Sequence, residues 1–190
     1  MGTLFVDKLD PQSGTSLEIG SSGDTITIPS GATIANSGTS TGFGISSANT
    51  PLFQASLGAN QGIGDQTNTK INMSREVLDS NSKYDTSNYR FTPGSTGYYQ
   101  FMICITTESG ISSSVTAYTK LYKNGSAVPI NPVHSDITSA SGSFNTFFID
   151  EATSASDYYE AYFWHNKGSS IDLYESGSSS LTYWIGNKLT

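Results

Sequence analysis

Apolar and polar side chains alternate with a period of two along several segments of the second half of the chain. In residues 98–106, Tyr99, Phe101, Ile103 and Ile105 share one parity, and the other parity is also largely apolar. Successive side chains of a strand point to opposite faces of the sheet. We therefore expect residues 98–106 to form a central strand that is covered on both faces.

Other segments repeat this pattern, and turn residues separate them. They cover residues 115–123, 127–128, 144–149, 158–165, 171–174 and 181–189, and residues 53–57 open the domain. Asn124-Gly125 suits a type I′ turn and predicts a hairpin between residues 115–123 and 127–128. No window has a helical period, and many short strands separated by turns predict an all-β sandwich or jelly roll. This domain would occupy residues 50–190.

Residues 1–49 have a different pattern, rich in Gly, Ser and Thr and with only two aromatic residues. Short apolar-polar units alternate there with turn residues, and one copy of such units cannot bury a useful core. We expect several chains to wrap together as an extended β arm; a flexible Gly/Ser linker is the alternative. The arm would share a thin core made of Leu17, Ile19, Ile26, Ile28 and Ile34. Residues 36–42 contain no apolar side chain and are the expected linker.

The composition excludes several classes of function. Charged residues make up 13% of the chain, against roughly 25% in typical soluble domains. The net charge is -7 and no basic cluster is present, which argues against nucleic acid as a partner. No run of about 18 apolar residues predicts membrane insertion, and residues 1–7 lack the features of a signal peptide. The single cysteine, Cys104, excludes an intrachain disulfide and is expected to be buried in its strand.

The order of the aromatic segments resembles a known family. The residues that carry the resemblance are Asn88-Tyr89-Arg90-Phe91-Thr92-Pro93, then Gly97-Tyr98-Tyr99 with Phe101, and finally Trp184-Ile185-Gly186-Asn187-Lys188-Leu189. They resemble the globular head of complement component q and related tumour-necrosis-factor-like (TNF-like) jelly rolls, over roughly residues 51–190. The resemblance implies a ten-stranded jelly roll that forms a homotrimer around an axis lined by one sheet of each subunit.

The N-terminus resembles a second class of proteins. Residues Thr3-Leu4-Phe5-Val6-Asp7-Lys8-Leu9, with Ser13-Gly14, are similar to the start of structural proteins of tailed phages, particularly cyanophages. The chain lacks the Gly-X-Y stalk of the animal relatives, because its glycines are irregularly spaced. This resemblance implies a protein of the virion surface that is assembled in the host cytoplasm. Residues 1–49 would then bind other phage virion proteins.

Large aromatic side chains are the candidates for the core or for the trimer interface. Both roles suit Tyr and Trp, which combine a large apolar area with a polar atom. The candidates are Tyr98, Phe101, Tyr158, Tyr162, Trp164 and Trp184. A site for a host surface receptor or glycan would need exposed aromatic residues at a loop. Its candidates are Tyr84, Asp85, Asn88 and Tyr89, and packing beneath the loop is the alternative for the two tyrosines.

We find no catalytic constellation in the sequence, so we expect no enzyme activity and no organic cofactor. His134 lies in a loop and His165 at a strand end, and both are expected to be ordinary surface or turn histidines. No serine has the Gly-x-Ser-x-Gly context of a hydrolase nucleophile. Acidic residues in the expected loops leave calcium as the one metal to consider, although there is no EF-hand pattern. These acids are Asp79, Asp85, Asp150, Glu151, Asp157 and Glu160.

The predicted function is a bacteriophage fibre or spike: a non-enzymatic trimer whose heads attach to the host. Three identical heads would add weak contacts through multivalency. A trimeric capsid decoration (cement) protein, which clamps neighbouring capsid subunits, is the first alternative, and the short chain of 190 residues suits it. A secreted lectin-like module is a weaker alternative, and an enzyme is the weakest.

Overall fold

The computed structural model describes residues 9–11, 13–35, 37, 49–107, 115–129, 135–137, 142–175, 177 and 181–189. The chain divides into two compact units, Met1–Gly44 and Ile45–Thr190. The described residues form strands, turns and extended segments, and they include no helix that is long and apolar enough to cross a membrane.

The described part of the second unit contains fourteen strands. Seven have five or more residues: β1 Leu52–Ser56, β4 Arg75–Asp79, β7 Gly97–Thr106, β8 Val115–Lys123, β11 Ser143–Ala152, β12 Tyr159–His165 and β14 Tyr183–Lys188. Seven are short: β2 Gln61–Ile63, β3 Thr69–Lys70, β5 Tyr84–Asp85, β6 Arg90–Phe91, β9 Ser126–Ala127, β10 Ser135–Ile137 and β13 Ile171–Leu173. Every strand expected from the alternating pattern is confirmed. The total exceeds the expected ten because the short segments form separate strands.

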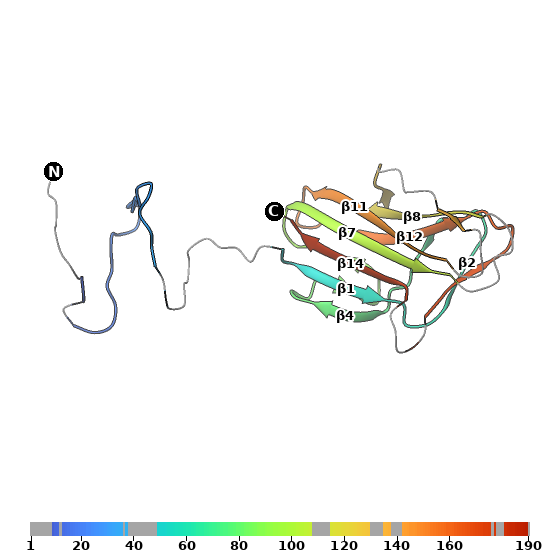
Figure 1. The fold of residues 1–190 in the computed structure, drawn as a ribbon, viewed down its shortest axis with the longest axis horizontal. Coiled ribbons are helices and arrows are strands. Elements are labelled where there is room, and N and C mark those ends of the chain that lie inside the picture. Colours follow the sequence, from blue (N-terminus) through green and yellow to red (C-terminus); the bar gives the residue numbers. More distant parts are fainter. Residues whose placement is uncertain are drawn as a thin grey trace. The chain divides into compact units, whose positions relative to one another are not determined.

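The strands build two main antiparallel sheets (Figure 1). One sheet has five strands in the order β11-β7-β14-β1-β4. The other has seven strands: the path is β10-β8-β12-β6-β5, while β3 pairs with β12 and β9 with β8. A small ribbon joins β2 to β13. The first and last strands of the second unit, which we call the head, are β1 and β14. They are neighbours in one sheet, so the two ends of the head are hydrogen-bonded to each other.

The hairpin predicted at Asn124-Gly125 is present between β8 and β9. Both turn residues have positive φ, 52° at Asn124 and 78° at Gly125, as a type I′ turn requires. The register places Tyr122 opposite Ala127.

An aromatic cluster fills the space between the two sheets. The ring of Phe53 stacks on Phe91 with centroids 4.3 Å apart and meets Trp184 edge-on at 4.7 Å. Phe101 lies 4.7 Å from Tyr159 across the sandwich. Two of the six aromatic interface-or-core candidates, Phe101 and Trp184, are therefore core residues.

The first unit has turns but no strand in its described residues. Asp24 N donates to Ser21 O at 2.9 Å, and Ala32 N donates to Pro29 O at 3.1 Å. The five apolar side chains expected in the thin core of the arm are 42–59% exposed: Leu17, Ile19, Ile26, Ile28 and Ile34. One copy of the described segment therefore does not form the expected core. Most of the expected linker, residues 36–42, lies outside the described residues.

Candidate functional site

The face of the five-stranded sheet that points away from the core is open and apolar. On it, Phe147 is 71% exposed, Ile149 57% and Tyr98 49%. The register pairs Phe147 with Met102 and Ile149 with Gln100, so the side chains of β11 and β7 share this face. The prediction that β7 is covered on both faces is wrong for the first half of this strand, because Tyr98 and Gln100 are exposed, whereas Cys104 and Thr106 on the same face are buried. We name this surface the open face.

A hollow of about 170 Å³ marks the middle of the open face. It is lined by Gln100, Phe101, Met102, Phe147, Ile185 and Asn187. The two amides bond to each other, since Gln100 Nε2 donates to Asn187 Oδ1 at 2.8 Å. The lining therefore has no charged side chain, and its amides are partly satisfied within the chain. Such a composition is typical of the centre of an oligomer interface.

At the edge strand β4, the apolar surface of the five-stranded sheet continues. Leu78 pairs with Gln54 of β1, and a register irregularity follows this pair. Val77 and Leu78 are 50% and 45% exposed. An exposed edge strand with apolar side chains is a surface that proteins usually cover.

The solvent face of the seven-stranded sheet carries a second aromatic surface. Tyr118 of β8 stacks on Trp164 of β12 with centroids 4.6 Å apart, and Tyr122 stacks on Tyr162 at 3.9 Å. With Tyr158, these side chains form what we name the outer aromatic surface, and each is partly exposed. Hence three of the interface-or-core candidates, Tyr158, Tyr162 and Trp164, lie neither in the core nor on the open face.

Tyr84, a receptor-loop candidate, is a buried residue. Its ring stacks on Phe53 at 5.1 Å, and its hydroxyl donates to Met73 O at 2.9 Å. Burial raises the pKa of the Tyr84 phenol well above its usual range. The proposal that this tyrosine is exposed to a receptor is therefore corrected: it packs beneath the loop, which was the alternative considered.

The other receptor-loop candidates form a tight turn at the surface. Asp85 Oδ2 accepts from Asn88 Nδ2 at 2.7 Å, and Asp85 Oδ1 accepts from the backbone N of Ser87 and Asn88. The Asn88 side chain is the main reason that the pKa of Asp85 is lowered. Asn88 is exposed and Tyr89 half-buried, with a φ of 52° at Tyr89. The structure brings the three residues together, but Asp85 is engaged by its own turn.

Lysines pair with three of the six acidic residues named for calcium, Asp150, Asp157 and Glu160. Lys123 Nζ lies 3.4 Å from Asp150 Oδ2 and 3.3 Å from Asp157 Oδ2. Lys70 Nζ lies 2.7 Å from Glu160 Oε1. Among the residues that the structure describes, no group of three or more His, Cys, Asp or Glu side chains is placed to hold a metal ion.

His165 is fully buried, so its expected place at the surface or in a turn is wrong. Its Nε2 lies 3.0 Å from Ile63 O, and its Nδ1 accepts from Lys167 N at 3.3 Å. The two ring nitrogens thus tie the end of β12 to β2 and to the turn that follows β12. Cys104 is buried as predicted, and burial raises the pKa of its thiol. His134 lies outside the described residues.

Comparison with solved structures identifies the fold. The murine APRIL structures at pH 5.0 and pH 8.5 match with TM-scores of 0.53 and 0.52, both at 12% identity, over 73% of this chain and 98% of theirs. Eiger TNF from S. frugiperda matches at 10% identity and a TM-score of 0.44, over 73% of this chain and 90% of its own. No protein-family model matches the chain, and no curated protein matches its sequence.

The second unit is therefore a TNF-like jelly roll. This part of the resemblance drawn from the sequence is confirmed. The phage origin, the host attachment and the homotrimer stay predictions, since similarity at 12% identity establishes the fold alone.

Proposed function

We propose that three copies of this chain associate through the open face to form a homotrimer. The open face carries this proposal, because an apolar surface lies on one sheet of the sandwich around a hollow whose lining has no charged side chain. Phe147 alone leaves 71% of its area in water, and covering apolar area contributes about 25 cal/mol per Å². Three-fold packing would place one five-stranded sheet of each subunit along the axis, as the sequence resemblance implies.

The proposed role of this trimer is a non-enzymatic binding head on the surface of a bacteriophage particle, where it attaches to the host. The phage-like opening at Thr3–Gly14 supports this location. The exposed apolar side chains of the arm, from Leu17 to Ile34, give a reason for three arms to intertwine and to bind other virion proteins. Because a trimer presents every surface site three times, weak contacts of the single sites would together give a higher overall affinity for a cell surface.

A capsid decoration protein is the second candidate. The short chain of 190 residues favours it, since a long reach is unnecessary on a capsid. The same trimer would then clamp neighbouring capsid subunits through its arms.

Light scattering of the purified chain tests the trimer. We expect a mass about three times the 20.2 kDa of one chain, and a monomer at micromolar concentration contradicts the proposal. Deletion of residues 1–40 should leave a trimeric head that no longer joins particles. Incorporation of the shortened chain would refute the role of the arm.

Loss of the gene product separates the two candidate functions. Particles without a fibre should adsorb poorly to the host and keep intact heads. Particles without a decoration protein should adsorb normally and release their genome on heating or dilution.

A further inference from the structure

The outer aromatic surface combines aromatic rings with the ammonium group of Lys120, which has no carboxylate partner among the described residues. Lys120 lies between Tyr118 and Tyr122 along β8, and its Nζ is 5.1 Å from the ring centroid of Tyr118. Tyr162 is its cross-strand partner on β12. Among the described residues, no carboxylate lies within 4.0 Å of Lys120 Nζ, whereas the other lysines of the sheet have oxygen partners. The stacked pairs Tyr118–Trp164 and Tyr122–Tyr162 therefore lie on either side of the Lys120 ammonium group, which we call the available cation.

The carboxylates near this surface are already engaged. Glu160 is 7% exposed and bound by Lys70 at 2.7 Å. Asp85 accepts three hydrogen bonds within its turn, and Arg90, 3.8 Å from it, also covers the ring of Tyr158 at 5.1 Å. Lys123, next to Tyr122 in β8, lies 3.4 Å from Asp150 Oδ2 and 3.3 Å from Asp157 Oδ2. Lys120 is thus the lysine of this surface that no described carboxylate neutralises, which favours an anionic group on the ligand.

The aromatic rings of this surface can contact a chain of sugars at two neighbouring positions. Tyr162 and Trp164 are two residues apart on one face of β12, about 6.8 Å along the strand. Tyrosine and tryptophan offer apolar ring atoms to the C–H groups of a sugar and polar atoms to its hydroxyls. One available cation can pair with one anionic group of the ligand, so single-stranded DNA is the competing anionic chain for the test.

We propose that the outer aromatic surface binds an acidic polysaccharide, with a sugar carboxylate paired to Lys120 and the sugar rings against Tyr162 and Trp164. This inference rests on the proposed function, because it names the ligand class for host attachment. The surface lies on the sheet opposite the open face, and a single subunit supplies all of it (Figure 1). It therefore stays accessible when the open faces of three subunits are covered, and the trimer carries it three times.

Titration of the full chain with an oligogalacturonate tests the proposal, by calorimetry and by tryptophan emission in parallel. Trp184 is fully buried in the core, so a change in emission would report Trp164. We expect Lys120→Gln to lower the affinity at least about tenfold, since a charged pair is removed. Lys167→Gln is the matched control: it removes a lysine from the turn after β12, whose Nζ bonds Ser170 O at 3.4 Å, and it should leave the affinity unchanged.

A neutral malto-oligosaccharide and a single-stranded DNA of similar length complete the design. The proposal is supported if the chain binds the uronate with a higher affinity than the malto-oligosaccharide and the DNA. Lys120→Gln and Trp164→Ala should both lower this affinity while the variants stay folded. No calorimetric binding of the uronate at millimolar concentration overturns it, as does equal binding of DNA or an unaffected Lys120→Gln variant. The mass of the same sample is measured independently. A monomer that binds the uronate would contradict the proposed trimer but not the proposed ligand. A trimer that does not bind the uronate would contradict the proposed ligand but not the trimer.

Discussion

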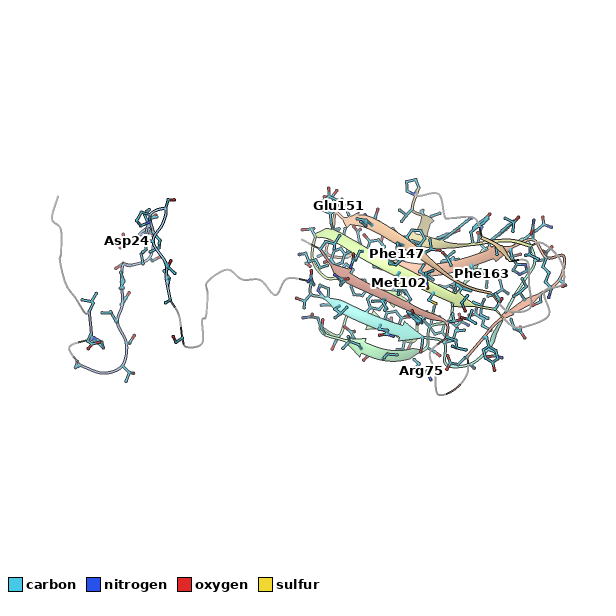
Figure 2. All side chains as sticks on the ribbon, viewed as in Figure 1. Asp24, Arg75, Met102, Phe147, Glu151 and Phe163 are labelled. Atoms are coloured by element: carbon cyan, nitrogen blue, oxygen red, sulfur yellow. The ribbon has the colours of Figure 1, made fainter. Side chains whose placement is uncertain are left out.

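Phe147 of β11 lies directly opposite Met102 of β7, on the face of the sheet that the rest of the described chain leaves uncovered (Figure 2). Its sequence neighbour Phe148 points the other way and is only 2% exposed, whereas Phe147 is 71% exposed. Strand β11 thus presents a large aromatic ring to each side. One ring is buried in the core, and the other would be buried in the proposed trimer.

Phe147→Glu should dissociate the proposed trimer. The substitution would place a carboxylate of each subunit in an apolar interface, where desolvation and like-charge repulsion cost on the order of several kcal/mol. The single chain should stay folded, because the Phe147 side chain contributes little to its core. Light scattering should report a monomer, and circular dichroism should report an unchanged β content.

Tyr174→Glu is the matched control for that variant. Tyr174 follows β13 and is 40% exposed, and it lies outside the five-stranded sheet. The mass of this variant should equal that of the unmodified chain. If Phe147→Glu keeps the unmodified mass as well, the open face is not the interface.

Gly186→Ala should destabilise the head, because a side chain has no space there. A Cβ at this position would lie 2.5 Å from Cε1 of Phe53 and 2.6 Å from Cδ1 of Phe101. Overpacking of this kind costs about 1–3 kcal/mol. The midpoint of urea unfolding should fall accordingly. Gly64→Ala is the control, since the nearest atom to its Cβ would be Thr67 Oγ1 at 3.8 Å, and an unchanged midpoint is expected.

Most of the long strands could be predicted because five or more alternating residues define a period, but β4 was missed. Of the short strands, β9 and β13 were predicted beside turn residues, whereas two residues alone, as in β5 or β6, make no pattern. Gly186 belongs to the C-terminal motif of the family resemblance, and only the structure shows the reason: two aromatic rings occupy the space of its side chain.

Which face of each strand is buried was harder to predict than the positions of the strands. In β12, both faces carry aromatic residues. The alternation therefore places Tyr162 and Trp164 on the same face but does not show whether this face is buried or exposed. The buried position of His165 had a usable signal: it shares its parity with Ala161 and Phe163, which are also buried. For β7, the pattern indicated apolar surface on both faces but not that part of one face is exposed in the described chain.

Tyr84→Phe should lower stability and leave host attachment unchanged. The variant keeps the buried ring and loses the hydrogen bond from the hydroxyl to Met73 O. An unsatisfied buried carbonyl costs about 1–3 kcal/mol, which should lower the urea midpoint. Adsorption of particles that carry the variant should equal that of unmodified particles. Loss of adsorption in a folded variant would restore Tyr84 as a receptor residue.

Asp157 should make the stability of the head sensitive to acid. Its carboxylate accepts a hydrogen bond from Asn124 Nδ2 at 2.8 Å, and this bond is the main reason that its pKa falls from 3.8 to about 2. Backbone N–H groups of residues 153 and 154 and the ammonium of Lys123 add to the effect. Because the folded state holds the ionised form more strongly, this contribution is complete above the ordinary pKa and is lost as the pH falls toward about 2.

Urea unfolding of the unmodified chain and of Asp157→Asn at several pH values measures this contribution. The unmodified chain should be more stable at neutral pH, and the difference should shrink between pH 4 and pH 2, where its own Asp157 becomes protonated. Asn124→Gly removes the amide donor and still allows the positive φ of the turn, so it should move this loss of stability to higher pH. A difference that stays constant down to pH 2 would show that the Asp157 carboxylate is not held in its ionised form by these donors.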